Sequence, residues 1–190
     1  EGPHEDGKTE MWVVLEAKPG AKLIYGFKED ITEEQFAAAI EEQKLEELVN
    51  WISVKKGDTF FIPAGMLHAI GAGILIAEIQ QNSDTTYRVY DFGRLGLDGK
   101  PRELHTEKAQ KVTNLSSSLG KELADIDAGV CCEYFKTYRR VLQGRTEIEV
   151  EPAHFQIIMV LEGSGNVNGM PFKMGDTILL PAAMGKAVLE

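Results

Sequence analysis

Cysteine is nearly absent from this chain, and the two that occur, Cys131 and Cys132, are neighbours. Adjacent cysteines are a poor framework for stapling a secreted fold, so we expect free thiols and a reducing compartment. The sequence also lacks any apolar run near the roughly 18 residues of a membrane span, and we expect no signal peptide. These absences predict a cytoplasmic protein without membrane contact.

Basic residues are too few to balance the acidic ones. Lys and Arg number 20 against 30 Asp and Glu, which gives a formal net charge of −10. Nonspecific binding to nucleic acid or acidic membranes needs clustered cations, so the sequence predicts neither partner. An anionic small ligand would need a local basic group to hold it. Nothing in the sequence indicates a protein partner.

Apolar residues fall in short runs separated by Gly, Asp and Pro, which is typical of an antiparallel sandwich or barrel. With 190 residues and 43% hydrophobic content, the chain can bury a core. The runs that we expect to be strands are Met11–Leu15, Leu23–Phe27, Thr59–Ile62, Ile74–Ile79, Tyr87–Phe92, Glu133–Leu142, Phe155–Leu161 and Thr177–Leu180. The sequence therefore predicts a mainly β protein.

One helix is well signalled within this β pattern, over Thr32–Trp51. Thr32 and Gln35 form a T-x-x-Q capping box at its start, and apolar residues follow at helical spacing. A weaker candidate, rich in Glu and Lys, spans Leu104–Val112.

The sequence contains an internal repeat. Gly57–Ala69 matches Gly175–Ala187 at seven of thirteen positions without a gap. Upstream, Glu10–Glu16 pairs with Gln156–Glu162. The offset is 146 residues for the upstream pair and 118 for the downstream pair, so the first copy holds 28 more residues between its landmarks. That surplus is about the length of the helical segment, which we interpret as an insertion into one copy of a duplicated fold.

A metal-binding motif lies in the first copy. The pattern G-D-x-x-x-x-P-x-G-x-x-H from Gly57 to His68 resembles the second sequence motif of cupins, small double-stranded β-helical or jelly-roll barrels in which a turn presents the histidine inward to a metal. The resemblance implies a mainly β, duplicated cupin. We expect three regions: a metal-binding cupin domain at 1–113 with a helical insertion at about 31–52, a linker at 114–129, and a second cupin domain without metal ligands at 130–190.

Longer segments around this motif resemble type I phosphomannose isomerases, the zinc-dependent mannose-6-phosphate isomerases. They are Lys8–Trp12, His68–Gly71 and Glu78–Arg88, and the resemblance extends to Arg102–His105. It implies a phosphorylated hexose as substrate, Zn²⁺ as cofactor, and interconversion of mannose 6-phosphate and fructose 6-phosphate through an enediol.

The resemblance also implies roles for five residues. Glu10 and His68 match two zinc ligands, and Arg88 matches the active-site arginine. Lys8 and Glu78 match polar groups of the pocket; we expect both to be catalytic along with Arg88, with Glu78 as the preferred base and Lys8 and Arg88 also binding substrate. The family's other two ligands, a Gln and a His, precede the counterpart of Glu10 and have no match here. Further ligands are therefore expected upstream of residue 1, and both ends of the chain are expected to be cut.

The residues themselves point to the same site. Glu10 becomes Gln156 in the second copy and His68 becomes Lys186, so only the first copy keeps both metal-binding groups. If Glu10 points into the barrel, Lys8 does too, because alternate residues of a strand share a face. Proton transfer between C1 and C2 of a sugar needs a cation near the developing oxyanion, which zinc supplies.

Alternative interpretations remain for these residues and for the function. Glu78 and Arg88 could form an ordinary cross-strand ion pair, and His105 and His154 are expected to be structural. A first rival function is a cupin that binds a sugar phosphate without turning it over. A second is another metal-dependent cupin enzyme, because carboxylate and imidazole ligands with open positions also suit iron.

Overall fold

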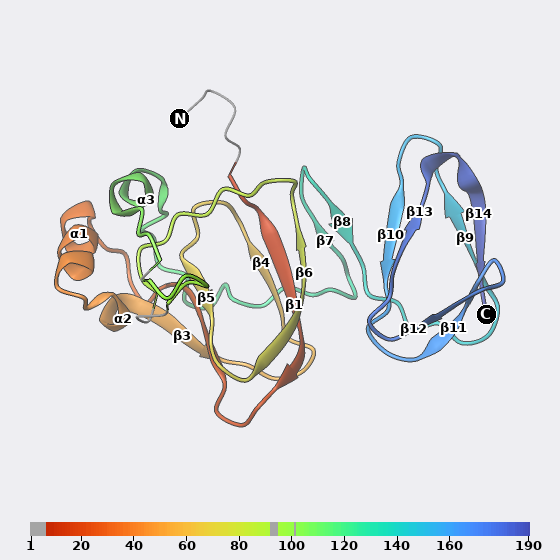
Figure 1. Cartoon of the computed structure of the whole chain (residues 1–190), viewed down its shortest axis with the longest axis horizontal. Helices are drawn as coiled ribbons and strands as arrows, with labels where there is room; N and C mark the ends of the chain where they lie inside the picture. The colour runs from red at the N-terminus through yellow and green to blue at the C-terminus, as the bar shows by residue number, and fades with distance from the viewer. Residues whose placement is uncertain (1–6, 92–94, 101) are drawn as a thin grey trace. The chain divides into compact units, whose positions relative to one another are not determined.

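The computed structural model describes residues 7–91, 95–100 and 102–190, and it divides into two compact units, Glu1–Tyr138 and Arg139–Glu190 (Figure 1). Part of the expected linker packs on the first unit, since the buried Ser118 hydroxyl donates to the carbonyls of Tyr25 and Phe27. The functional domains expected at 1–113 and 130–190 stay a prediction. Among the described residues, no helix has the length and apolar character to cross a membrane.

The first unit is a barrel of two facing antiparallel sheets (Figure 1). One sheet has the order β4-β1-β6, with β1 at Glu10–Ala17, β4 at Thr59–Ile62 and β6 at Ile74–Gln80. The other has the order β3-β2-β5, with β2 at Lys22–Phe27, β3 at Val49–Ser53 and β5 at His68–Ile70. Trp12 and Phe60 from the first sheet pack in one buried cluster with Leu23 from the second. The two sheets therefore enclose a common core.

The second unit repeats this arrangement on a smaller scale. Its strands form two antiparallel sheets, β10-β13 and β12-β11-β14-β9. Their bounds are Thr146–Val150 for β9, Gln156–Met159 for β10, Ser164–Val167 for β11, Met170–Lys173 for β12, Thr177–Leu180 for β13 and Gly185–Leu189 for β14, with a 3₁₀ turn, η1, at Ala182–Met184. Val150, Leu180 and Ala187 from both sheets form its buried core.

The strand register confirms the duplication expected from the sequence. In the first unit Glu10 pairs with Ile62 across β1 and β4. In the second, Gln156 pairs with Leu180 across β10 and β13, at the positions that the repeat makes equivalent. The fold is thus mainly β, a duplicated cupin.

The turn before β4 in the first unit is also the same as the turn before β13 in the second. The backbone amide of Lys55 donates to Asp58 at 2.9 Å, and that of Lys173 donates to Asp176 at 2.8 Å. Gly57 and Gly175 precede these aspartates with φ angles of 94° and 90°, a left-handed conformation that favours glycine. The shared Gly-Asp pair of the two copies is explained by this turn.

Three helices cover the outer face of the β3-β2-β5 sheet: α1 at Glu33–Glu41, α2 at Leu45–Leu48 and α3 at Thr106–Val112. The capping box of Thr32 and Gln35 is confirmed, with both reciprocal hydrogen bonds present. The weaker helix predicted over Leu104–Val112 is confirmed as α3. Phe36 of α1 packs with Phe27 of β2 in the buried cluster beneath the helices.

The predicted length of the Thr32–Trp51 helix is wrong. α1 ends at Glu41, Gln43 takes a left-handed φ of 57°, and Val49–Ser53 forms strand β3 against β2. Valine, tryptophan and isoleucine in this segment favour a strand, and β2 offers them a partner that local sequence does not reveal. Long-range pairing has therefore overridden the helical pattern.

Two predicted strands are also wrong in the described residues. Tyr87–Asp91 is irregular; its backbone pairs with His105 instead of a strand, and Val89 packs in the cluster beneath the helices. The Glu133–Leu142 run contributes only the short strand β8, Lys136–Thr137, which pairs with β7, Val130–Cys131. The first run is apolar because Val89 packs in the core, whereas Tyr134, Tyr138, Val141 and Leu142 of the second run are exposed.

Candidate functional site

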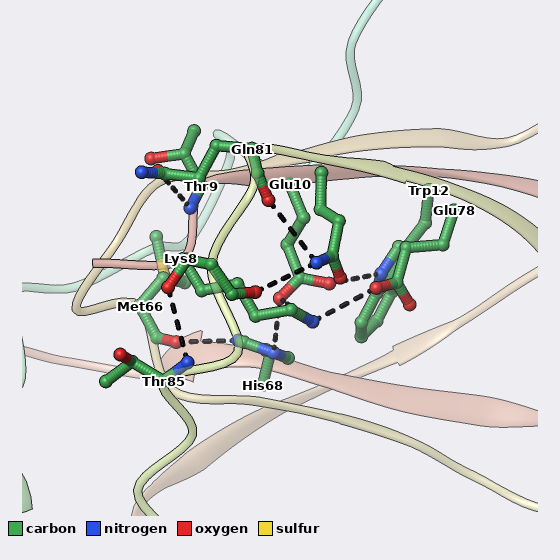
Figure 2. A network of polar contacts seen from close by, with 11 residues as sticks. Lys8, Thr9, Glu10, Trp12, Met66, His68, Glu78, Gln81 and Thr85 are labelled. Atoms are coloured by element: carbon green, nitrogen blue, oxygen red, sulfur yellow. Dashed lines mark hydrogen bonds and ion pairs between the residues drawn. The ribbon is translucent and has the colours of Figure 1, made fainter. Parts of the chain in front are cut away.

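Glu10 is a carboxylate buried at the start of a central strand. β1 pairs with β4 on one side and β6 on the other, and Glu10 is only 1% exposed between Ile62 and Gln80. Its Oε2 accepts a hydrogen bond from the Trp12 indole at 2.9 Å. Its Oε1 lies 3.2 Å from Lys8 Nζ and 3.3 Å from His68 Nε2 (Figure 2). Burying a carboxylate costs free energy unless it is paired, and Trp12, Lys8 and His68 together provide the donors that Glu10 requires.

His68 reaches Glu10 from the opposite sheet, where it begins β5 and pairs with Tyr25. The turn before it requires Gly65, which has a φ of +84° and whose Cβ, if present, would meet the Val112 carbonyl oxygen at 2.6 Å. His68 Nδ1 lies 2.7 Å from the Met66 carbonyl (Figure 2). A carbonyl only accepts, so Nδ1 carries the proton and Nε2 is the nitrogen directed at Glu10.

This arrangement fits a bound cation. When His68 is neutral with Nδ1 protonated, its Nε2 lone pair lies 3.3 Å from a carboxylate oxygen, and two acceptors at that distance need a proton or a metal ion between them. Imidazole nitrogen and carboxylate oxygen are ligands of zinc, and a backbone carbonyl that fixes the other ring nitrogen is the usual support for a metal-binding histidine. Within the described ranges, no group of three or more His, Cys, Asp and Glu side chains could hold a metal ion. Glu10 and His68 are thus two side chains of the kind that could hold a metal ion.

Burial raises the pKa of Glu10, but the hydrogen bond and charge of His68, the charge of Lys8 and the Trp12 donor outweigh this effect and lower the pKa to about 2. Glu10 is therefore ionised at neutral pH, as a metal ligand must be.

Lys8 and Glu78 form the more exposed edge of the site. Lys8 Nζ lies 3.0 Å from Glu78 Oε1, and Glu78 is carried by β6 opposite Trp12 (Figure 2). Burial lowers the pKa of Lys8, but hydrogen bonds and charges from Glu78 and Glu10 more than offset it, so the pKa is raised and Lys8 stays an ammonium ion. The expectation that Lys8 and Glu10 share one face is confirmed by their contact. Glu78 pairs with Lys8 and not with Arg88, so the alternative of a Glu78–Arg88 ion pair is wrong.

Arg88 does not join this cluster by a hydrogen bond or an ion pair. Its backbone amide donates to His105 Nδ1 at 3.2 Å, and the His105 amide donates to the Arg88 carbonyl at 2.6 Å. Arg88 as a residue is half-buried, and among the described residues its side chain makes no ion pair. The structure therefore brings together Lys8, Glu10, His68 and Glu78. The backbone of Arg88 is hydrogen-bonded to His105 instead.

The other histidines lie apart from the cluster. His105 packs its ring near Tyr87 at 6.0 Å between centroids, in agreement with a structural role. The His154 side chain is 78% exposed. His4 lies outside the described residues.

Trp12 is the residue that the sequence reasoning missed. The motifs give Trp12 no role of its own, whereas the structure shows its indole bonded to Glu10 and its ring 5.2 Å from the His68 ring, edge-on at 80°. The internal repeat held the signal, because the position equivalent to Trp12 is Ile158.

The second unit has no counterpart of this cluster. Lys186, in place of His68, is 65% exposed and pairs with Glu147 at 3.2 Å. Gln156, in place of Glu10, donates to the Glu149 carbonyl at 3.0 Å. Lys186 thus forms a surface ion pair, and Gln156 binds the backbone of β9.

Comparisons with known proteins agree with the resemblance seen in the motifs. The chain is 38% identical over 198 residues to the mannose-6-phosphate isomerase ManA of Bacillus subtilis strain 168, a match that takes in 98% of this chain and 62% of that protein. A solved mannose 6-phosphate isomerase from Bacillus subtilis matches with a TM-score of 0.79 at 33% identity, over 98% of this chain and 62% of that one. A zinc-bound mannose 6-phosphate isomerase shares the fold, with a TM-score of 0.64 at 15% identity over 96% of this chain and 63% of that one.

No family model matches the sequence. The chain spans about three fifths of the length of the relatives that it matches.

Proposed function

This chain is a homologue of the mannose-6-phosphate isomerases, and from that premise we propose that the protein is a zinc-dependent enzyme that interconverts mannose 6-phosphate and fructose 6-phosphate. The observation that carries the proposal is the buried Glu10 carboxylate facing His68 Nε2 at 3.3 Å. The carboxylate and the imidazole could together bind a cation. The pair occurs in the first repeat alone, and it lies beside Lys8 and a second carboxylate, Glu78.

Glu10 and His68 would hold the zinc ion. A catalytic zinc site uses three protein ligands and keeps one position open, so we propose that the remaining ligand or ligands come from outside the described residues. When bound, zinc polarises the sugar's carbonyl oxygen and stabilises the negative charge that develops on it.

Glu78 would move the proton between C1 and C2 of the sugar. It stands at the open edge of the cluster with its side chain 32% exposed, where a substrate carbon could approach it. A positioned base of this kind contributes roughly 10²–10⁴ in rate. Lys8, an ammonium ion 3.0 Å from Glu78, would lie near the enediol oxygens.

Arg88 would bind the phosphate group or the enediolate. Its planar guanidinium presents paired donors that match phosphate oxygens, and in the described residues it is not neutralised by a carboxylate. In a chain with a net charge of −10, a local cation of this kind is what an anionic sugar phosphate needs.

The test uses the protein with Glu10→Gln or His68→Ala, assayed for bound zinc and, with a coupled enzyme, for fructose 6-phosphate. Both variants should lose zinc and turnover, whereas His154→Ala, at an exposed histidine of the other unit, should keep both. Zinc and turnover that survive in Glu10→Gln and His68→Ala contradict the proposal. Binding of mannose 6-phosphate without product would favour the sugar-phosphate-binding module, and iron in the purified protein another metal-dependent cupin.

We also propose that the protein works in the cytoplasm. Cys131 and Cys132 are both free thiols in the structure, as a reducing compartment allows. Its partner there would be the phosphorylated hexose, with no role for nucleic acid.

A further inference from the structure

The Trp12 side chain contacts both residues of the Glu10–His68 pair. Its indole N–H donates to Glu10 Oε2 at 2.9 Å, and its ring stands edge-on to the His68 imidazole at 5.2 Å (Figure 2). Trp12 is 2% exposed in the barrel core, packed with Val14 and Phe60. Packing fixes the indole, so the donor cannot move away from the carboxylate.

The two oxygens of Glu10 therefore have different surroundings. Oε2 is held by the indole, while Oε1 faces His68 Nε2 and Lys8 Nζ. A carboxylate can bind a metal through one oxygen or through both. Oε1 also accepts from Lys8, but it is the oxygen that faces His68 Nε2, so a metal beside His68 would lie against Oε1.

The repeat gives independent support. The three positions of this group change together in the second copy, where Glu10 corresponds to Gln156, Trp12 to Ile158 and His68 to Lys186. Ile158 keeps the apolar packing of that position, in the core of the second unit, but has no donor. If Trp12 served the core alone, the first copy would have no need of an N–H at this place.

We propose that Trp12 is a positioning residue for the metal ligand Glu10: its indole holds Oε2 and so keeps the carboxylate oriented with Oε1 towards His68, where the zinc ion would bind. The proposal rests on the metal site of the proposed function. It assigns to Trp12 a direct effect on metal affinity, because supporting hydrogen bonds to metal ligands typically change affinity 10–100-fold when they are removed.

The experiment compares zinc affinity in the full-length protein, by competition with a chromophoric chelator, for the wild type, Trp12→Phe and Trp51→Phe. Trp12→Phe keeps an aromatic ring but loses the donor, and we expect zinc to bind roughly 10–100-fold more weakly. Trp51→Phe changes the only other tryptophan and should leave the affinity within about threefold, well below that expected loss. Trp12→Ile, which copies the second repeat, should be at least as weak as Trp12→Phe.

A second measurement separates loss of the donor from a damaged core. In metal-free protein the indole N–H of Trp12, assigned by its disappearance in Trp12→Phe, should exchange slowly with water and change its ¹H–¹⁵N chemical shift in Glu10→Gln.

Unchanged zinc affinity in Trp12→Phe, or an indole signal that does not respond to Glu10→Gln, would overturn the inference. Product formation from mannose 6-phosphate is scored separately in the wild type. A protein whose zinc affinity depends on Trp12 as described but which forms no fructose 6-phosphate would refute the isomerase and leave the role of Trp12 standing.

Discussion

The two units of this chain share a backbone plan and differ in chemistry. β1 and β4 pair in the same register as β10 and β13, and the Gly-Asp turns before β4 and β13 make the same hydrogen bonds. Yet the position of a buried carboxylate in one unit holds an amide in the other. The comparison separates the residues that a cupin needs to fold from those that one copy needs for its site.

The shared residues serve turns and packing. Gly57 and Gly175 supply a left-handed backbone conformation, and Ile62 and Leu180 fill equivalent core positions. The residues that differ carry the polar contacts of the first unit. A duplicated sequence therefore acts as its own reference, in which a change between copies marks chemistry more reliably than the motif does alone.

The largest effect should come from giving the first unit the residues of the second. We expect Glu10→Gln combined with His68→Lys to abolish zinc binding and to reduce turnover by roughly 10³-fold or more, since a metal stabilises transition-state charge by several kcal/mol. Metal analysis and the coupled assay measure the two losses. The reverse change, Gln156→Glu with Lys186→His, should create no zinc affinity, because Lys186 is exposed and Ile158 offers no donor. Zinc bound by the reverse variant would break the comparison.

Glu78→Gln should lower kcat by roughly 10²–10⁴-fold, because the amide cannot accept the proton. Zinc should stay bound, because residue 78 does not contact Glu10. The measurement is steady-state turnover alongside zinc content. Loss of zinc together with turnover would show that Glu78 supports the metal, whereas unchanged kcat would move the base to another residue.

Ile62→Ala and Leu180→Ala should each cost about 2–5 kcal/mol of unfolding free energy, because both side chains are fully buried at equivalent positions. Urea unfolding of each variant tests this. A cost at one position only would show that the shared register does not produce a shared core.

The smallest effect concerns the turn before β5. Gly65→Ala should destabilise the fold by about 1–3 kcal/mol, because the residue has a left-handed φ and its Cβ would collide with the Val112 carbonyl. The equivalent residue of the second unit is already Ala183, within η1, and Ala183→Gly should cost less than about 1 kcal/mol. Thermal or urea unfolding measures both, and equal costs would mean that the two turns are alike after all.

Much of the site could be predicted from the sequence because the repeat and the cupin-like motif hold local information. The Thr32–Gln35 capping box, the first-unit position of Glu10 and His68, and the shared face of Lys8 and Glu10 all depend on residues near in sequence. The helix continuing to Trp51 failed because β3 exists only through its pairing with β2.

The partners of the side chains within the site were harder to predict. Lys8 pairs with Glu78 across 70 residues, and the indole of Trp12 reaches back to Glu10 on the same strand. Alternation along a strand gives the face of a side chain but not the acceptor that it finds there. The metal roles of Glu10 and His68 and the catalytic roles of Glu78, Lys8 and Arg88 stay predictions.

Glu10 and His68 lie on two strands that are held differently in the barrel, and this has a consequence for how the proposed zinc ion would exchange. β1 is hydrogen-bonded on both edges, by β4 and β6, whereas β5 is three residues long and pairs with β2 alone in its sheet. Short edge strands open locally at lower free energy than central ones. His68 would thus be the ligand that dissociates from the metal first. Backbone amides of β5 should exchange with deuterium well before those of β1. The proposed zinc ion would then leave and bind again through local opening of β5, while the Glu10 carboxylate stays in position on β1.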